Sequence, residues 1–286
     1  MACASAALNK MKFYLFLLAL LLPLYAFAAE KESAYERVMR TGIMRCGYGL
    51  EMPYSYKDAE TGEIKGFFHD YIELMAANLG LKVEWVEEMG WGQFPTALDT
   101  GRIDAWCTTA WRTAARAKLA DSITPITYQP LYVVVRASDK RFDNKREALN
   151  SADVKFVGVE GQIELQIAQA NFPQAKTIAL PQSSDFSQAM MDVDAKKADA
   201  LIVTGVIFAK YDQANPGKLR RVEGIPPVQV SGEGFAVKAG EHTLRRMFDN
   251  ATMELLETGA IDRIVKSYNM PEGTCIVNNP AAALFR

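Results

Sequence analysis

Apolar residues recur every three or four positions over residues 66–80, and then at every second position over residues 81–85. The first spacing predicts an amphipathic helix, and the second predicts a strand with one buried face. The same two patterns alternate along the rest of the chain. Further helices are expected at 95–98, 162–170, 184–193, 205–211 and 244–255, and further strands at 103–107, 131–135, 156–159, 177–180 and 200–203. This alternation predicts an α/β protein with mainly parallel sheets.

Two segments of the chain resemble each other. Residues 99–108 and 194–204 each contain two Asp, then Ala, then an apolar strand that ends in Thr. Each has the pattern of a helix end, a turn and a strand that brings a hydroxyl to its C-terminal edge. Because ligands of open α/β sheets bind at that edge, the repeat indicates two similar lobes that face one cleft. Coincidence is the alternative, since such turns are common.

The N-terminus has the pattern of an export signal. Lys10 and Lys12 precede an apolar run over residues 13–24, and Ala26-Phe27-Ala28 follows with the small residues that signal peptidase requires. We therefore predict a cleavable signal peptide over residues 1–28 and a protein located in the periplasm. A membrane anchor is the alternative, but a bilayer-spanning helix needs about 20 apolar residues.

The composition narrows the functional class. The chain has 286 residues, of which 49% are hydrophobic and 23% are charged, and this excludes a disordered chain, a collagen-like chain and a coiled coil. Its 32 basic and 34 acidic residues give a net charge of −2. Because there is no basic excess, no nucleic-acid partner is expected.

The cysteines allow few pairings. Cys46, Cys107 and Cys275 follow the predicted signal peptide, so at most one disulfide forms among them. Cys46 and Cys107 fall in predicted buried strands, where thiols usually pack as small apolar groups. Cys275 is placed to tie the C-terminal tail to the first lobe. The spacings match no metal motif, and His69 and His242 are the only histidines, so we expect no metal site and no cofactor.

A series of short motifs follows a specific order along the chain. The motifs are Met-Pro-Tyr-Ser-Tyr at 52–56, Gly-Phe-Phe-His-Asp at 66–70, Leu-Gly-Leu-Lys-Val-Glu at 79–84, Trp at 91, Ala-Leu-Asp-Thr-Gly-Arg-Ile-Asp-Ala at 97–105, Thr-Ala-Ala-Arg-Ala-Lys at 113–118, Pro at 125, Gly-Phe-Ala-Val at 234–237, and the helix from 244 to the Gly at 259. This series resembles the periplasmic solute-binding proteins of the polar amino-acid uptake family, bacterial extracellular solute-binding protein family 3. Each motif alone is weak, and the resemblance depends on their order and spacing.

The resemblance implies an α/β fold of two lobes, the type II periplasmic-binding-protein fold, with the ligand cleft between the lobes. Lobe 1 would hold residues 33–130 and 231–286, and lobe 2 would hold residues 131–230. The implied function is the binding component of an ABC uptake transporter, which closes by hinge motion around an amino acid or a similar organic acid. The implied partners are this small carboxylate-bearing solute and a membrane permease, and the protein is expected to be a monomer.

Arg116 is the strongest candidate for the ligand site. Thr113-x-x-Arg116-Ala-Lys matches the family stretch whose Arg binds the ligand's α-carboxylate. A guanidinium suits a carboxylate because it donates two parallel hydrogen bonds. Arg112 has the same spacing from Thr109 and is the rival, and a solvated surface charge is the alternative role. In the family this stretch also supplies hydroxyls and N–H groups, so Thr109 is a second candidate, with a turn-forming role as its alternative.

Three aromatic residues accompany these candidates. Trp91 occupies the family position where a ring packs on the ligand's side chain and offers a face to apolar stems or cations. Trp111 stands where the family has a small hydroxyl residue, so it would narrow the pocket or stack on the ligand. For both tryptophans, packing in the interior is the alternative. Tyr54 is interpreted as structural, because the aromatic after Pro packs the first strand–helix turn.

Departures from the family pattern bear on the substrate. Lobe 2 usually ends a strand with Asp, which holds the ligand's α-ammonium, whereas this chain has Thr204, which has no charge to offset the ammonium's desolvation. Glu51, in a region where the family has an aromatic residue, or Glu160 would have to replace that charge. Otherwise the ligand is a carboxylate without an amine. Gln162 follows Gly161 at a predicted helix start, where the family binds the carboxylate.

Two other functions stay open. A periplasmic dehydratase of the cyclohexadienyl type shares this fold and uses a cleft carboxylate as its general acid, for which Glu51 or Glu160 would be the candidate. A ligand-sensing module for a membrane receptor is the other alternative. Because the sequence shows no nucleophile–base pair and no metal site, we predict a binding protein rather than an enzyme.

Overall fold

The computed structural model describes residues 32–271 and 273–278, so the predicted signal peptide lies outside the described residues. Within that part of the chain, no helix has both the length and the apolar character to cross a membrane. The helices are α2 (Ala34–Thr41), α3 (Phe67–Asn78), α4 (Phe94–Thr100), η1 (Arg116–Lys118), η2 (Arg146–Leu149), α5 (Glu164–Asn171), α6 (Phe186–Asp194), α7 (Gly205–Ala214), α8 (His242–Glu257) and α9 (Ala260–Ser267). The strands are β1 (Ile43–Tyr48), β2 (Tyr56–Lys57), β3 (Ile64–Lys65), β4 (Lys82–Glu88), β5 (Ala105–Trp111), β6 (Ala120–Ser122), β7 (Thr127–Arg136), β8 (Lys155–Val159), β9 (Lys176–Leu180), β10 (Ala200–Thr204), β11 (Leu219–Arg221), β12 (Gln229–Lys238) and β13 (Ile276–Val277).

Most of these strands join one continuous sheet, in the order β4-β1-β5-β12-β7-β10-β8-β9. At one end β1 pairs in parallel with β4 and β5, and at the other end β8 pairs in parallel with β9 and β10. These parallel ends confirm the α/β class that the alternation of helices and strands predicts. In the middle, β12 pairs antiparallel with β5 and β7, and β7 pairs antiparallel with β10.

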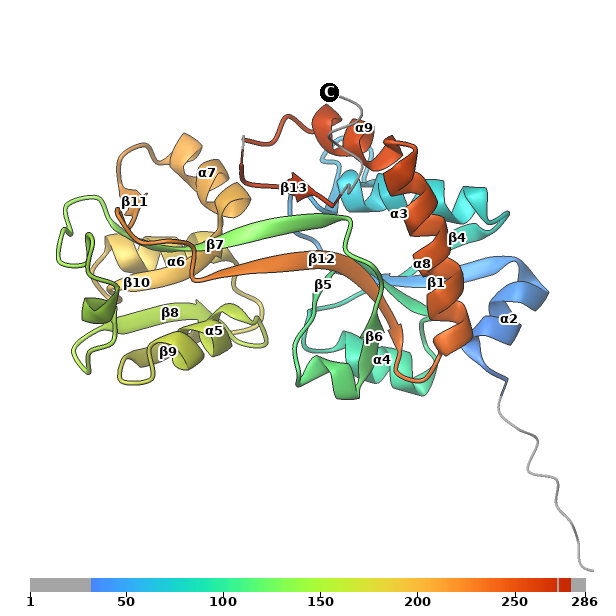
Figure 1. The fold of residues 1–286 in the computed structure, drawn as a ribbon, viewed down its shortest axis with the longest axis horizontal. Coiled ribbons are helices and arrows are strands. Elements are labelled where there is room, and N and C mark those ends of the chain that lie inside the picture. Colours follow the sequence, from blue (N-terminus) through green and yellow to red (C-terminus); the bar gives the residue numbers. More distant parts are fainter. Residues whose placement is uncertain (1–31, 272, 279–286) are drawn as a thin grey trace, which may run out of the picture. The chain divides into compact units, whose positions relative to one another are not determined.

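The long strands β7 and β12 connect the two parallel ends of the sheet. They lie side by side in Figure 1 and pair from Gln229 opposite Leu131 to Glu233 opposite Thr127. Each strand then continues toward a different end, because β7 goes on to pair with β10 and β12 goes on to pair with β5. The predicted lobe borders, at 130/131 and 230/231, fall inside this paired stretch, and the division at these residues stays a prediction.

Helices cover both ends of the sheet. The apolar stripe predicted over residues 66–80 forms α3, whose buried residues include Phe68, Ile72 and Met75. Helix α3 packs on β5 and on α8, while α5, α6 and α7 pack on the β8–β10 end. Several element borders differ from the prediction, and two of them bear on the site. Strand β5 runs on to Trp111 with every residue buried, so its threonines lie within the strand, and α5 begins at Glu164 rather than at Gln162.

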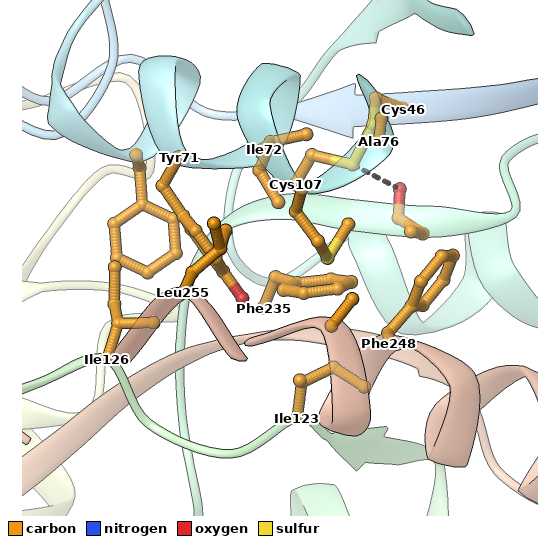
Figure 2. Packing of buried hydrophobic residues seen from close by; sticks show 14 of the residues in the cluster. Cys46, Tyr71, Ile72, Ala76, Cys107, Ile123, Ile126, Phe235, Phe248 and Leu255 are labelled. Atoms are coloured by element: carbon orange, nitrogen blue, oxygen red, sulfur yellow. Dashed lines mark hydrogen bonds between the residues drawn. A yellow bond between two sulfur atoms is a disulfide. The ribbon is translucent and has the colours of Figure 1, made fainter. Parts of the chain in front are cut away.

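Cys46 and Cys107 form a disulfide in the core between α3 and α8 (Figure 2). Their strands are parallel neighbours, and Cys46 lies opposite Ala105, so Cys107, two residues further on, points to the same face of the sheet. The two Cα atoms are 5.4 Å apart, within the range that a disulfide spans. The expectation that both thiols pack unpaired is therefore wrong. The suggested tie through Cys275 is also wrong, because that cysteine is free.

Of the three cysteines after the predicted signal peptide, only Cys275 should react in the denatured, unreduced protein, and all three should react after reduction. The bridge has a sequence separation of 61, so replacing both Cys46 and Cys107 by Ala should lower the free energy of unfolding by about 4 kcal/mol, because the unfolded chain regains loop entropy. Urea unfolding followed by circular dichroism measures this loss. The control Cys275→Ala should keep the wild-type midpoint, and a double variant with that same midpoint would contradict the prediction.

Candidate functional site

A small cavity lies where β5, β12 and the loop before α3 meet the N-termini of α5 and α7. Its volume is about 20 Å³. It is lined by Glu51, Tyr54, Trp91, Thr109, Trp111, Arg116, Gln162, Ile163, Glu164, Thr204, Ile207 and Glu233. Of the residues that the sequence nominated for the ligand site, all line this cavity except Glu160 and the rival arginine, Arg112. Tyr54, interpreted as structural, also lines the cavity, and the sequence analysis missed Glu164 and Glu233.

A second, larger cavity of about 690 Å³ adjoins the first and shares Glu51, Trp91, Gln162 and Ile207 with it. Glu160 and Lys210 line only this outer space. The inner cavity has room for about one water molecule, whereas pockets for small ligands measure roughly 300–1,000 Å³. In this structure the inner cavity is therefore too small for a molecule much larger than water.

Arg116, at the start of η1, brings a cation to the inner cavity. Its backbone N–H donates to Thr113 Oγ1 at 3.1 Å, and its Nη1 donates to the Trp111 carbonyl at 3.5 Å. The guanidinium lies 5.6 Å from the centre of the Phe94 ring. Burial lowers the pKa of Arg116, and the negative charge of Glu164 opposes that shift. The side chain is therefore a half-buried cation with donors to spare for an anion.

The rival Arg112 has a different environment. Its side chain is exposed and donates to the Ile123 carbonyl at 2.8 Å. It does not line either cavity. The geometry therefore favours Arg116 over Arg112 as the arginine of the site.

Thr109 holds two indole rings through its backbone. Its carbonyl accepts from Trp91 Nε1 at 2.9 Å and from Trp106 Nε1 at 3.1 Å. The rings of Trp91 and Trp106 meet edge to face, with centroids 5.7 Å apart. Gly49 leaves the space for this arrangement, because a Cβ there would lie 2.8 Å from the Trp91 ring. Trp91 is thus a fixed aromatic wall shared by the inner and outer cavities.

Glu233 orients a polar network beneath the cavity. One of its oxygens accepts from Trp111 Nε1 at 3.3 Å, and the other accepts from Thr127 Oγ1 at 2.9 Å and Gln129 Nε2 at 2.5 Å. Tyr54 extends the network, because its hydroxyl donates to Gln129 Oε1 at 2.5 Å. Burial raises the pKa of Glu233 to about 8, against the effect of these donors. Both oxygens of Glu233 are thus occupied by hydrogen bonds that hold Trp111 directly and Tyr54 through Gln129.

Glu51 and Glu164 are two further acids at the cavity. Burial, reinforced by the charges of Glu164 and Glu233, raises the pKa of Glu51 to about 8, while Lys210 opposes the shift. Burial also raises the pKa of Glu164 to about 7. Glu164 is 4% exposed, and its Oε2 has no hydrogen-bond partner among the described residues. Among the described residues neither carboxyl forms an ion pair, although the charge of Arg116 lowers the pKa of Glu164 and that of Lys210 lowers the pKa of Glu51 against the effect of burial.

Thr204 and Gln162 complete the set predicted from the sequence. Thr204 is buried and caps α7, because its Oγ1 accepts the Ile207 N–H at 3.4 Å. A threonine there satisfies a helix terminus, which is a sufficient structural reason for its presence. Gln162 precedes α5 in the loop and borders both cavities. The later start of α5 places Glu164, rather than Gln162, in the first turn of the helix.

Comparisons with known proteins agree on one family. Residues 44–271 match the bacterial extracellular solute-binding proteins, family 3. The chain is similar to a probable amino-acid ABC transporter-binding protein of Haemophilus influenzae, which is 24% identical over 89% of this chain and 96% of the relative. A probable histidine-binding protein of Campylobacter jejuni is 24% identical over 76% of this chain and 81% of that protein.

Solved structures support the same fold. The crystal structure of an ancestral amino acid-binding protein, described as a precursor of cyclohexadienyl dehydratase, has a TM-score of 0.70 and 26% identity, over 83% of this chain and 99% of that one. A cysteine-binding protein of Campylobacter jejuni, 17% identical, has a TM-score of 0.71 over 86% of this chain and 99% of that one. These matches confirm the type II periplasmic-binding-protein fold expected from the sequence.

Glu164→Gln should stabilise the ligand-free protein at high pH. The pKa of Glu164 is raised from 4.5 to about 7 in the folded state, so between these pH values the unfolded chain has lost a proton that the folded protein keeps. The free energy of unfolding therefore falls as pH rises through this window, and the deficit is complete above it. Gln does not ionise, so the free energy of unfolding of the variant should exceed that of the wild type by about 3 kcal/mol at pH 8.5 and match it at pH 4.

Urea unfolding at the two pH values measures this difference. Glu257→Gln, on the exposed end of α8, makes the same chemical change away from the cavity and should follow the wild type at both. An equal offset between Glu164→Gln and the wild type at pH 4 and pH 8.5 would contradict the titration of this carboxyl.

Proposed function

This chain belongs to the bacterial extracellular solute-binding proteins of family 3, and from that premise we propose that its solute is an amino acid or a similar small organic acid. The protein acts as the solute-binding component of an ABC uptake transporter. The relatives named as amino-acid- and histidine-binding proteins support this solute class. The proposed working form is a periplasmic monomer, exported by the signal peptide at residues 1–28, that delivers its solute to a membrane permease.

The half-buried guanidinium of Arg116 is the observation that carries the proposal. A carboxylate at the inner cavity would pair with this cation and accept two parallel hydrogen bonds from it. Thr109 and Gln162, which line the same cavity, would complete the polar contacts around the carboxylate. Trp91 and Trp111 would cover the rest of the solute with flat apolar faces.

The small volume of the inner cavity fits binding by closure. The residues around it come from both sides of the β7–β12 pair, which is the connection between the two parallel ends of the sheet. Bending at β7 and β12 would open the outer space of about 690 Å³ and admit a solute, and closing would bury it. Lobe 1 (33–130 and 231–286) and lobe 2 (131–230) are the proposed moving bodies.

A thermal-shift screen tests the proposal. The panel holds amino acids, their deaminated analogues and dicarboxylates, and a solute that binds only the folded state raises the melting temperature by mass action. We expect stabilisation by at least one α-amino acid at millimolar concentration. A panel with no stabilising compound would overturn the proposed solute class.

A cyclohexadienyl-type dehydratase is the second candidate function. Burial raises the pKa of Glu51 to about 8 and that of Glu164 to about 7, so near neutral pH this cavity holds partly protonated carboxyl groups that could act as general acids. Such an acid would protonate a leaving hydroxyl, which departs as water. The likeness to a precursor of such an enzyme favours this candidate. Incubation with prephenate or arogenate, followed by detection of aromatic product, separates turnover from simple binding.

Arg116→Ala should lower the affinity for the best carboxylate solute by about 2–5 kcal/mol, because the bound anion loses a partner in a desolvated site. Isothermal titration calorimetry on the wild type and the variant measures the change. Arg112→Ala removes an equal charge four residues away, outside the cavity, and should bind as the wild type does. Equal affinity of Arg116→Ala and wild type would refute the role of Arg116.

A further inference from the structure

We propose that Glu164 and Glu51 form a cation subsite opposite Arg116, and that the solute is a cationic amino acid with one carboxylate and two positively charged groups. The inference rests on the proposed solute-binding function and names the substrate class within it. It also assigns the solute's ammonium to residues other than Thr204, whose hydroxyl already caps α7.

Glu164 supplies the strongest observation. Its carboxyl is 4% exposed, lines the inner cavity, and leaves Oε2 without a hydrogen-bond partner among the described residues. A buried, unpartnered carboxylate oxygen costs free energy, so such groups are rare in native proteins unless a ligand or a proton satisfies them. A ligand ammonium or guanidinium offers the positively charged N–H donors that this oxygen lacks.

The charged groups around the cavity set the balance. Glu51, from the loop after β1, faces Glu164 of α5, Glu233 of β12 and Lys210 of α7. Glu164 in turn faces Arg116 of η1. Lys210 is exposed and lines only the outer space. Among the described residues that line the inner cavity, Arg116 is therefore the one permanent cation beside three carboxyl groups.

Only two of these carboxyl groups are available to a solute. Glu233 already accepts from Trp111, Thr127 and Gln129 on its two oxygens. Among the described residues, no side chain donates a hydrogen bond to Glu51 or to Glu164. The carboxyl of Glu164 accepts from its own backbone N–H but keeps Oε2 unpartnered, and a solute carboxylate would occupy Arg116. One cationic group for each of the two acids balances the site, which is the charge pattern of arginine, lysine or ornithine. The face of Trp91 at the same cavity suits a guanidinium or an alkylammonium stem.

The arrangement couples charge to closure. Glu51 follows β1 at one parallel end of the sheet, and α5 with Glu164 packs on the other end, so closure without a solute would bring two acids together, and protonation would relieve that repulsion. A cationic solute replaces those protons, because the ionised carboxylates are its partners. Burial raises the pKa of Glu51 to about 8 and that of Glu164 to about 7, so binding near pH 6 should release protons and the affinity should rise with pH.

Isothermal titration calorimetry on the purified protein tests the inference with two matched solutes. L-Arginine and L-citrulline have almost the same shape, but only arginine has a charged side chain. We expect arginine to bind at least tenfold more tightly than citrulline. Titrations at pH 6 in two buffers of different ionisation enthalpy should show more than one proton released for each arginine bound, and fewer than half as many at pH 8.5.

Glu164→Gln identifies the group responsible. It should weaken arginine binding at pH 8 by at least tenfold, change citrulline binding by less than threefold, and release about one proton fewer at pH 6. Glu51→Gln should also weaken arginine binding and lower the number of protons released. Glu257→Gln is the control, because it removes one negative charge at the exposed end of α8, away from the cavity. Circular dichroism and the melting temperature of each variant verify its fold.

The outcomes separate the inference from the function on which it rests. Citrulline that binds within threefold of arginine, or a Glu164→Gln variant that binds arginine as the wild type does, overturns the cation subsite while solute binding stands. A protein that binds none of arginine, lysine and ornithine but binds a neutral or acidic amino acid also overturns it. A protein that binds no amino acid of any charge overturns the proposed function itself.

Discussion

The antiparallel pairing of β7 with β12 is the interaction on which the rest of the structure depends. These strands are the connection between the two parallel ends of the sheet, so they hold the halves of the cavity together. Their register places Glu233 opposite Thr127 and Ser231 opposite Gln129. Because side chains alternate along a strand, these four polar residues share one buried face. The hydrogen bonds of Glu233 then extend from the paired strands to Trp111 and, through Gln129, to Tyr54.

The cavity gathers several acidic groups whose burial disfavours their ionised forms. Carboxyl groups from β12, α5 and the loop after β1 are buried together, and each is held partly neutral by the cost of desolvating an anion. Arg116 lies at the same cavity without closing an ion pair to any of them. Under the proposed function, a solute of complementary charge would relieve this electrostatic cost, and that part of the binding free energy would favour the closed form.

The C-terminal tail contains a strand, β13, that the pattern of apolar residues did not predict. Residues after 270 have no clear periodicity, yet β13 pairs with β7 at Tyr128 and Thr127, next to the β12 pairing on the same strand. Thr274 is buried there, and a Cβ at Gly205 would lie 2.9 Å from its methyl group. The described part of the tail thus packs on β7 and on the start of α7. Cys275 lies in this segment as a free thiol, whereas Cys46 and Cys107 are joined in a disulfide.

Local periodicity was enough to predict the α/β class, helix α3 and the parallel strands, because amphipathic spacing reports directly which faces are buried. The spacing of Thr113 and Arg116, taken with the family resemblance, also led to residues that meet at one cavity. Strand register, by contrast, arises only when distant segments pair, so the disulfide and the Glu233 network could not be read from the sequence. The same holds for Glu164: as a glutamate in a helix it has the appearance of a solvated charge. Only the tertiary structure buries it against Glu51 and Arg116, because desolvation depends on which elements close over a residue.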